Sequence, residues 1–127
     1  MVTPTPLHRT QLDGLPLFKR GKVRDIYDLG DTLLIVSTDR ISCFDVVLPT
    51  CIPHKGEVLT RLSQFWFDYT SPLVQNHCIT TDWAEFPPSL QAYQDQLRGR
   101  TMVVRKLTPL PLECVVRGYL AGSGWRE

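Results

Sequence analysis

The chain has 127 residues, of which 43% are hydrophobic and 21% are charged, and its formal net charge is +1. This composition is typical of a globular domain and excludes a disordered chain. There is no basic run of the kind that binds nucleic acid, and a nearly neutral chain can attract anions only through local clusters of cations.

The cysteines and histidines show no spacing that would form a metal site. They are Cys43, Cys51, Cys78, Cys114, His8, His54 and His77. None of the cysteines forms a CxxC pair, so we expect free, buried thiols and no metal ligands. No apolar run has the length of a signal peptide or a membrane span, so we expect a cytoplasmic protein with no membrane partner.

Three strands are predicted in the first third of the chain: Leu15–Arg20, Val23–Asp28 and Thr32–Ser37. Gly30-Asp31 is a two-residue hairpin signal between the last two of these strands. A further extended piece is predicted over Phe44–Leu48, directly before Pro49.

One long helix is predicted after Pro53. Its apolar residues fall at i, i+4, i+7, i+8 and i+11: Val58, Leu62, Phe65, Trp66 and Tyr69. This spacing produces a single apolar stripe, and Ser71-Pro72 ends the pattern.

The second half of the chain is predicted to alternate short elements. They are a strand over Cys78–Thr81, a helix over Pro88–Leu97, strands over Thr101–Lys106 and Glu113–Tyr119, and the opening of a helix over residues 122–127. The predicted fold class is therefore α+β with a mostly antiparallel sheet.

Five segments carry residues suited to binding anions. The first is the turn at Gly21, after which Lys22 and Arg24 alternate along a strand and so share one face. Two cations beside a glycine turn suit a polyphosphate. The alternative is the solvated face of an edge strand.

The second segment follows the buried strand and contains Asp39, Arg40, Ser42 and Asp45. Loops at strand ends often carry binding sites. The alternative is a turn in which Asp39 caps backbone amides and Arg40 pairs with a carboxylate.

The third segment places Lys55 at the start of the long helix, where a cation opposes the helix dipole. A bound anion would explain it, and so would a lysine that extends into water.

The last two segments lie near the end of the chain. The connector from Lys106 to Glu113 holds two prolines and could line a flat pocket for a heterocycle, with Glu113 accepting from ribose hydroxyls, or serve only as a stiff crossover. Arg117 stands before a Gly-Ser-Gly turn, where its guanidinium and the Ser123 hydroxyl could hold a phosphate. The alternative is a loop with structural glycines.

The sequence resembles the N-terminal half of the SAICAR synthetase family from about Leu12 to Glu127. The resemblance rests on the R-G-K-V-R-D strand, the T-D-R-I-S-x-F-D loop and the P-L-E-x-V-V-R-G-Y-x-x-G-S segment, which occur in that order. It implies a two-lobed, ATP-grasp-like fold, with residues 1–108 in the N-terminal lobe and residues 109–127 as the hinge and the start of the second lobe.

The resemblance also implies a reaction. The family ligates L-aspartate to carboxyaminoimidazole ribonucleotide through an acyl phosphate, with ATP and Mg²⁺, in de novo purine biosynthesis. It assigns Lys22, Arg24, Lys106 and Glu113 to ATP, and the residues Asp39, Arg40, Ser42, Asp45, Lys55, Arg117 and Ser123 to the other substrates.

The chain departs from the family pattern at its end. Nothing in it resembles the acidic D-x-K-x-E-F-G segment of the family. We therefore expect a fragment that is inactive alone and supplies no metal ligands. The alternative is a non-catalytic module that binds nucleotide. A protein kinase is excluded, because the chain has neither H-R-D-x-x-x-x-N nor D-F-G.

Overall fold

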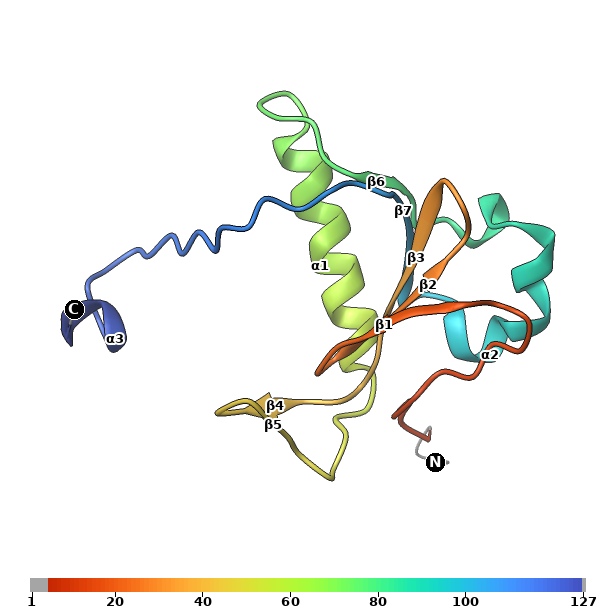
Figure 1. Ribbon diagram of the computed structural model, residues 1–127, viewed down its shortest axis with the longest axis horizontal. Coiled ribbons are helices and arrows are strands. Elements are labelled where there is room, and N and C mark those ends of the chain that lie inside the picture. The colour runs from red at the N-terminus through yellow and green to blue at the C-terminus, as the bar shows by residue number, and fades with distance from the viewer. Residues whose placement is uncertain (1–4, 127) are drawn as a thin grey trace.

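The computed structural model describes residues 5–126. Its centre is a five-stranded antiparallel sheet in the order β1-β2-β3-β7-β6. The strands are β1 (Leu17–Arg20), β2 (Arg24–Asp28), β3 (Thr32–Ser37), β6 (Cys78–Thr80) and β7 (Thr101–Arg105). Helices flank the sheet on both sides (Figure 1), so the predicted α+β class with a mostly antiparallel sheet is confirmed.

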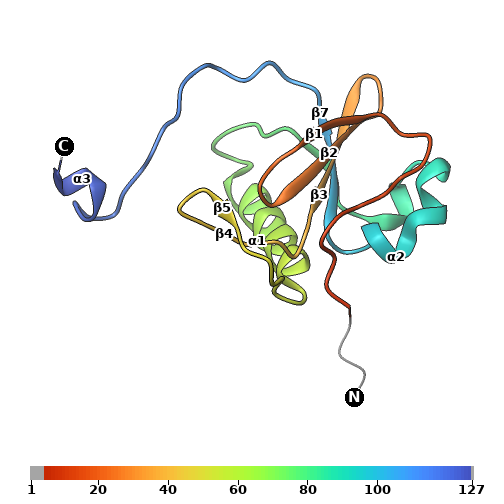
Figure 2. The ribbon, with the colours of Figure 1, turned by 60° about the horizontal axis from the view of Figure 1, so that its bottom comes forward.

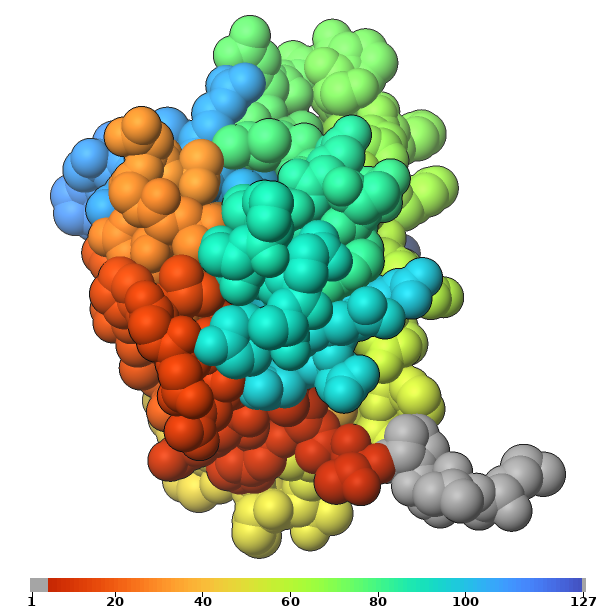
Figure 3. All heavy atoms as spheres, turned by 90° about the vertical axis from the view of Figure 1, so that its right-hand side faces the viewer, coloured from red at the N-terminus to blue at the C-terminus, as the bar shows by residue number. Residues whose placement is uncertain are grey.

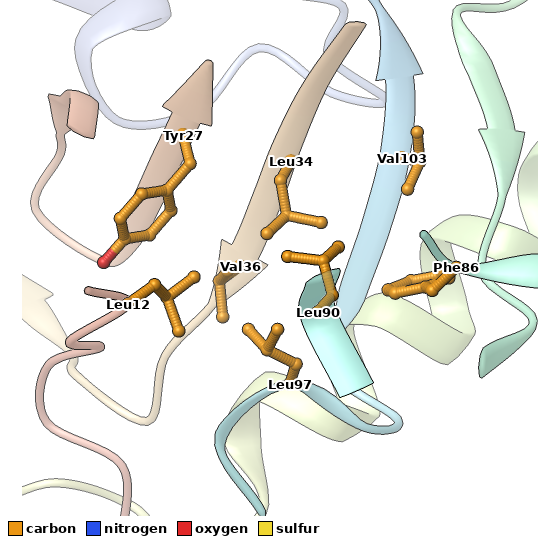
Figure 4. Packing of buried hydrophobic residues seen from close by; sticks show 8 residues of the cluster. All are labelled: Leu12, Tyr27, Leu34, Val36, Phe86, Leu90, Leu97 and Val103. Atoms are coloured by element: carbon orange, nitrogen blue, oxygen red, sulfur yellow. The ribbon is translucent and has the colours of Figure 1, made fainter. Parts of the chain in front are cut away.

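One face of the sheet is buried and is called the core face here. Its side chains come from alternate strand positions, and the segment with η1 (Trp83–Glu85), η2 (Pro88–Tyr93) and α2 (Gln94–Leu97) covers it (Figure 3). The core residues are Leu12, Tyr27, Leu34, Val36, Phe86, Leu90, Leu97 and Val103 (Figure 4). Their packing excludes water from the centre of this side of the sheet.

The opposite face, called the open face here, carries the other strand positions. Arg24 is paired with Ser37 and Ile26 with Ile35, so these residues share that face. Helix α1 (Lys55–Thr70) packs over β3 and β7 on this side. The part of the open face that β1 and β2 form lies beside the helix (Figure 2).

Helix α1 approaches the sheet through its small residues. Gly56 and Thr60 are its buried positions. The predicted helix is confirmed, but the apolar stripe is not its buried side, because Val58, Leu62, Phe65, Trp66 and Tyr69 are 51–67% exposed.

Two predicted extended segments differ in the structure. Phe44–Leu48 is not one strand: β4 (Ser42–Cys43) and β5 (Val46–Val47) form a hairpin whose two turn residues, Phe44 and Asp45, have positive φ. The strand predicted over Glu113–Tyr119 is wrong. Residues 107–122 run away from the sheet (Figure 1), and no neighbouring strand among the described residues supplies hydrogen bonds to them.

Two predicted helices take other forms. Pro88–Leu97 is a 3₁₀ segment followed by one α-helical turn rather than a continuous helix. The helix opening predicted at the end of the chain is α3 (Ser123–Arg126), while Glu127 lies outside the described residues.

All four cysteines are free, as predicted, but none is buried: Cys43 and Cys114 are exposed, and Cys51 and Cys78 are half-buried. Between residues 5 and 126 there is no group of three or more His, Cys, Asp or Glu side chains that could hold a metal ion. Over the same range, none of the helices combines the length and the hydropathy needed to span a bilayer.

Candidate functional site

Three predicted cations gather at one end of β2. Arg24 begins the strand, Lys22 stands in the turn before it, and Lys55 begins α1. Partial burial lowers the pKa of Lys55, and the charges of Arg24 and Arg40 lower it further, while Asp39 opposes them. Arg24 therefore lies close enough to Lys55 for their positive charges to repel, and a bound anion would relieve that repulsion.

Lys22 also has an anionic neighbour. Its ammonium forms an ion pair with Asp45, at the tip of the β4–β5 hairpin. The hydrogen bond from Lys22 lowers the pKa of Asp45. Both side chains are more than half exposed, so the pair is weak and a ligand could separate it at small cost.

An apolar hollow of about 480 Å³ lies on the open face farther along β2. It is lined by Ile26 and Leu33 of the sheet, by Phe18 and Lys19 of β1, and by residues 106–109. An apolar cleft of this kind fits a flat heterocycle.

Lys106 lies at the edge of this hollow. Its ammonium is 2.6 Å from an Asp28 carboxylate oxygen and 5.6 Å from the centre of the Phe18 ring. The hydrogen bond from Lys106 is the main reason that the pKa of Asp28 lies below its ordinary value. The side chain thus joins β2 to the start of the connector and fixes the hollow's width.

Asp39 is buried and fully engaged with protein groups. Its carboxylate accepts from the amides of Leu7 and Gly56, at 2.8 and 2.9 Å, and lies 2.9 Å from Arg100. Burial alone would raise the pKa of Asp39, but these hydrogen bonds and the Arg100 charge together lower it. Asp39 therefore fixes the start of α1 and, with it, Lys55.

Arg40 is 3% exposed, and its guanidinium also points into the protein. It donates to the carbonyls of His8, Gly21 and Lys22 and to the carboxylate of Asp25. The two remaining members of this segment, Ser42 and Asp45, lie in the β4–β5 hairpin.

Among the predicted residues of the connector and its continuation, Lys106 borders the hollow on this face, whereas the later ones lie apart from it. Glu113 and Arg117 are exposed in the segment that leaves the sheet (Figures 1 and 2). Arg117 donates to the Ser123 hydroxyl at 3.0 Å, so the structure brings these two predicted residues together but away from Lys22 and Arg24.

The sequence analysis missed several residues that shape the site. Asp25 and Arg100 hold Arg40 and Asp39, and Phe18, Ile26 and Leu33 line the hollow. The alternation along β2 contains a signal for two of them, because Ile26 shares a face with Arg24 while Asp25 takes the other face.

The comparisons with known proteins bear on the same segments. The family model described as SAICAR synthetase matches residues 17–127. The chain belongs to the SAICAR synthetase family. The resemblance predicted from the three sequence motifs is therefore confirmed.

Individual relatives agree. The chain is 58% identical over 118 residues to the phosphoribosylaminoimidazole-succinocarboxamide synthase of Thermodesulfovibrio yellowstonii, and 57% identical over 123 residues to that of a Geobacter species. These matches cover 93% and 97% of the chain but 40% and 42% of the relatives. The chain thus spans about two fifths of the length of these SAICAR synthetases.

A solved structure gives the same result for the fold. The SAICAR synthase of Saccharomyces cerevisiae, complexed with SAICAR, matches with a TM-score of 0.86 and 46% identity. The match covers 94% of this chain and 43% of the yeast chain. The sheet, α1 and the helical segment over the core face are therefore a portion of the SAICAR synthetase fold.

Proposed function

We propose that this chain is the ATP-binding portion of an enzyme that ligates L-aspartate to carboxyaminoimidazole ribonucleotide. ATP would phosphorylate the carboxylate of the ribonucleotide, and the amine of aspartate would displace phosphate, giving SAICAR, ADP and phosphate. The observation that carries the proposal is the alignment, on one face of β2, of an apolar hollow with a cluster of cations.

The order of groups along β2 fits a nucleotide. Ile26 lies under the hollow and Arg24 lies two residues away on the same face, next to Lys55. A nucleotide along this strand would place its base over Ile26 and its phosphates beside Arg24 and Lys22. The charge of Lys22 and Arg24 would then offset the charge of the triphosphate.

The connector would form the edge that recognises adenine. Residues 107–109 line the hollow, and Lys106 and Glu113 would lie near the nucleoside. The chain leaves the sheet at this point (Figure 1), which supports a lobe of residues 1–108 followed by a hinge and the start of a second lobe in residues 109–127.

The remaining predicted residues would serve the other substrates. Arg117 and Ser123, already joined by a hydrogen bond, would hold the phosphate of the ribonucleotide. Lys55 belongs to the cation cluster, and Asp45, in the same hairpin as Ser42, is paired with Lys22 of that cluster; a second anionic substrate would meet the phosphates of ATP here.

Mg²⁺ enters the proposal as the ion that accompanies ATP. Among residues 5–126, no three carboxylates, thiols or imidazoles gather into a ligand set, and Asp39 is committed to amides and Arg100. Mg²⁺ is commonly held by phosphates and water with only one or two carboxylates, and when bound it would neutralise phosphate charge.

The first test is nucleotide binding by the chain itself. In calorimetric titration the parent chain should bind ATP saturably and GTP more weakly. The variant Leu33→Trp, in which the indole fills the hollow, should lose binding of both ATP and adenosine. Val58→Trp, on the exposed side of α1, is the matched control and should bind as the parent does. Equal binding by the parent and Leu33→Trp would contradict the assignment of the hollow.

The second test is catalysis by a chimera that joins residues 1–127 to the remaining part of the Thermodesulfovibrio yellowstonii protein. ADP release should require both the imidazole ribonucleotide and aspartate. ADP release without aspartate, or equally with another amino acid, would refute the ligase. Saturable ATP binding with no turnover in the chimera would favour a nucleotide-binding module instead.

A further inference from the structure

The turn that carries Lys22 is held from inside the protein through three of its own consecutive carbonyl groups, which accept hydrogen bonds from interior residues. Arg40 donates to the carbonyls of Gly21 and Lys22, each at 2.9 Å. The backbone amide and hydroxyl of Thr38 donate to the carbonyl of Val23, at 3.1 and 2.8 Å. The amide of Gly21 donates to the carbonyl of Arg24 at 2.8 Å and closes the turn.

The guanidinium of Arg40 has almost no capacity left for a ligand. An arginine side chain has five N–H donors. Arg40 uses four of them, on the carbonyls of His8, Gly21 and Lys22 and on Asp25. Its side chain is 4% exposed, so a bidentate contact with a substrate phosphate would require the turn to be dismantled.

A buried carboxylate holds Arg40 in this position. Asp25 is 0% exposed and accepts from Arg40 at 2.8 Å and from Arg20 at 3.0 Å through one oxygen. Its other oxygen accepts from the amide and the hydroxyl of Thr10, at 3.0 and 2.8 Å. A carboxylate with this many donors stays ionised in the interior, and the ion pair fixes the plane of the guanidinium.

We infer that Arg40 is a positioning residue that acts on the nucleotide only through the Gly21–Lys22 turn. By binding the turn's carbonyls, Arg40 fixes the positions of Lys22 and of Arg24 at the start of β2, two members of the cation cluster. The phosphate site is therefore formed before the ligand arrives, and binding costs less conformational entropy. This inference rests on the proposed ATP site. It gives Arg40 a positioning role in place of the direct substrate contact that the family resemblance implies.

The test compares ATP with adenosine, which shares the base but has no phosphate. Arg40→Lys keeps a positive charge beside Asp25 but cannot reach both carbonyls as the planar fork does. In Arg40→Lys we expect the affinity for ATP to fall roughly tenfold and the affinity for adenosine to stay unchanged. A tenfold fall corresponds to the loss of about one charge-assisted contact to phosphate. A residue that served stability alone would leave the ratio of the two affinities unchanged.

Arg20→Met is the matched control. Arg20 donates to the same Asp25 oxygen, but its other contact is the carbonyl of Thr10 and not the turn. This variant should keep the parent's ratio of ATP to adenosine affinity. A folded Arg40→Lys protein with the parent's ratio, or a ratio that falls equally in Arg20→Met, would overturn the inference.

Hydrogen exchange of the unsubstituted chain decides the point even where the variant does not fold. Without nucleotide, the Gly21 amide should exchange as slowly as amides in β2 and β3. Fast exchange that becomes slow only with ATP would overturn a preformed turn. If neither ATP nor adenosine binds the parent, the proposed function fails, whereas the exchange of Gly21 still shows whether the turn is formed without a ligand.

Discussion

Gly56 is the point at which α1 touches the sheet, and Gly56→Ala should weaken the fold. An added Cβ would lie 2.1 Å from the carbonyl oxygen of Ser37, 2.9 Å from its carbon and 3.1 Å from Arg100. The first two atoms are backbone, so no side chain can rotate away. Helix α1 would have to move off β3 by roughly 1 Å to restore ordinary contact.

The size of the effect follows from three contributions. Overpacking against fixed backbone costs about 1–3 kcal/mol. Displacing the helix start also weakens the bond from the Gly56 amide to the Asp39 carboxylate, at about 1.5–3 kcal/mol for a charged acceptor. The better helix propensity of alanine returns up to about 1 kcal/mol. The net loss in free energy of unfolding should lie between about 1.5 and 6 kcal/mol.

Urea denaturation followed by far-ultraviolet circular dichroism measures this loss as a shift in midpoint at unchanged m. Gly21→Ala is the matched control, because its added Cβ would lie at an ordinary 3.5 Å from the Arg24 carbonyl oxygen. That variant should stay within about 1 kcal/mol of the parent. Gly56→Ala with the parent's stability would show that α1 does not rest on Ser37.

Two further predictions concern ionisable groups. Burial would raise the pKa of Asp39, but its hydrogen bonds and Arg100 together lower it below the ordinary 3.8. The stabilisation from Asp39 is therefore complete above pH 3.8 and is lost as the pH falls through the lower, folded value. When unfolding is measured against pH, the free energy of unfolding should fall less steeply with acid in Asp39→Asn, and an identical slope would contradict this. Burial and, to a smaller extent, the charge of Asp68 raise the pKa of the Cys78 thiol. A thiol reagent at neutral pH should therefore modify the exposed Cys43 before Cys78, as measured by mass spectrometry of the modified peptides. Faster modification of Cys78 would contradict its burial.

The parts of the fold that the sequence predicted well are those in which local pattern and tertiary environment agree. Strands β3 and β7 are rich in apolar and β-branched residues, and the Gly30-Asp31 turn joins β2 to β3 as expected. The helix after Pro53 also lies where its spacing predicts. In each case neighbouring strands or a covered face satisfy the preference of the segment.

The errors occur where the outcome depends on a partner that the sequence pattern does not show. Glu113–Tyr119 has strand-like alternation, but no strand among the described residues pairs with it. The apolar stripe of α1 is regular, yet the helix meets the sheet through Gly56 and Thr60, because only a small residue allows the close approach to Ser37. Periodicity identifies an element but not the face it buries.

The candidate site follows the same rule. Lys22 and Arg24 were predicted from a turn glycine and strand alternation, and both lie beside the open face. The alternative in which Asp39 caps backbone amides and Arg40 pairs with a carboxylate is the one that the structure supports. The sequence could not identify the partners, because Arg100 is 61 positions away from Asp39. The hollow beside Phe18 likewise depends on residues 106–109 lying against β1 and β2 before the chain leaves the sheet.

The position of Arg117 separates the two substrate sites of the proposed enzyme. In this chain it lies in the segment that leaves the sheet, with its guanidinium on Ser123 (Figure 1). Arg117→Ala should therefore leave the ATP affinity of the 127-residue chain unchanged in calorimetric titration. In the chimera the same change should raise the KM for the ribonucleotide at least about tenfold, the cost of one charged contact to phosphate, with little change in the KM for ATP. Equal losses for both substrates would place Arg117 at the ATP site and refute its assignment to the ribonucleotide.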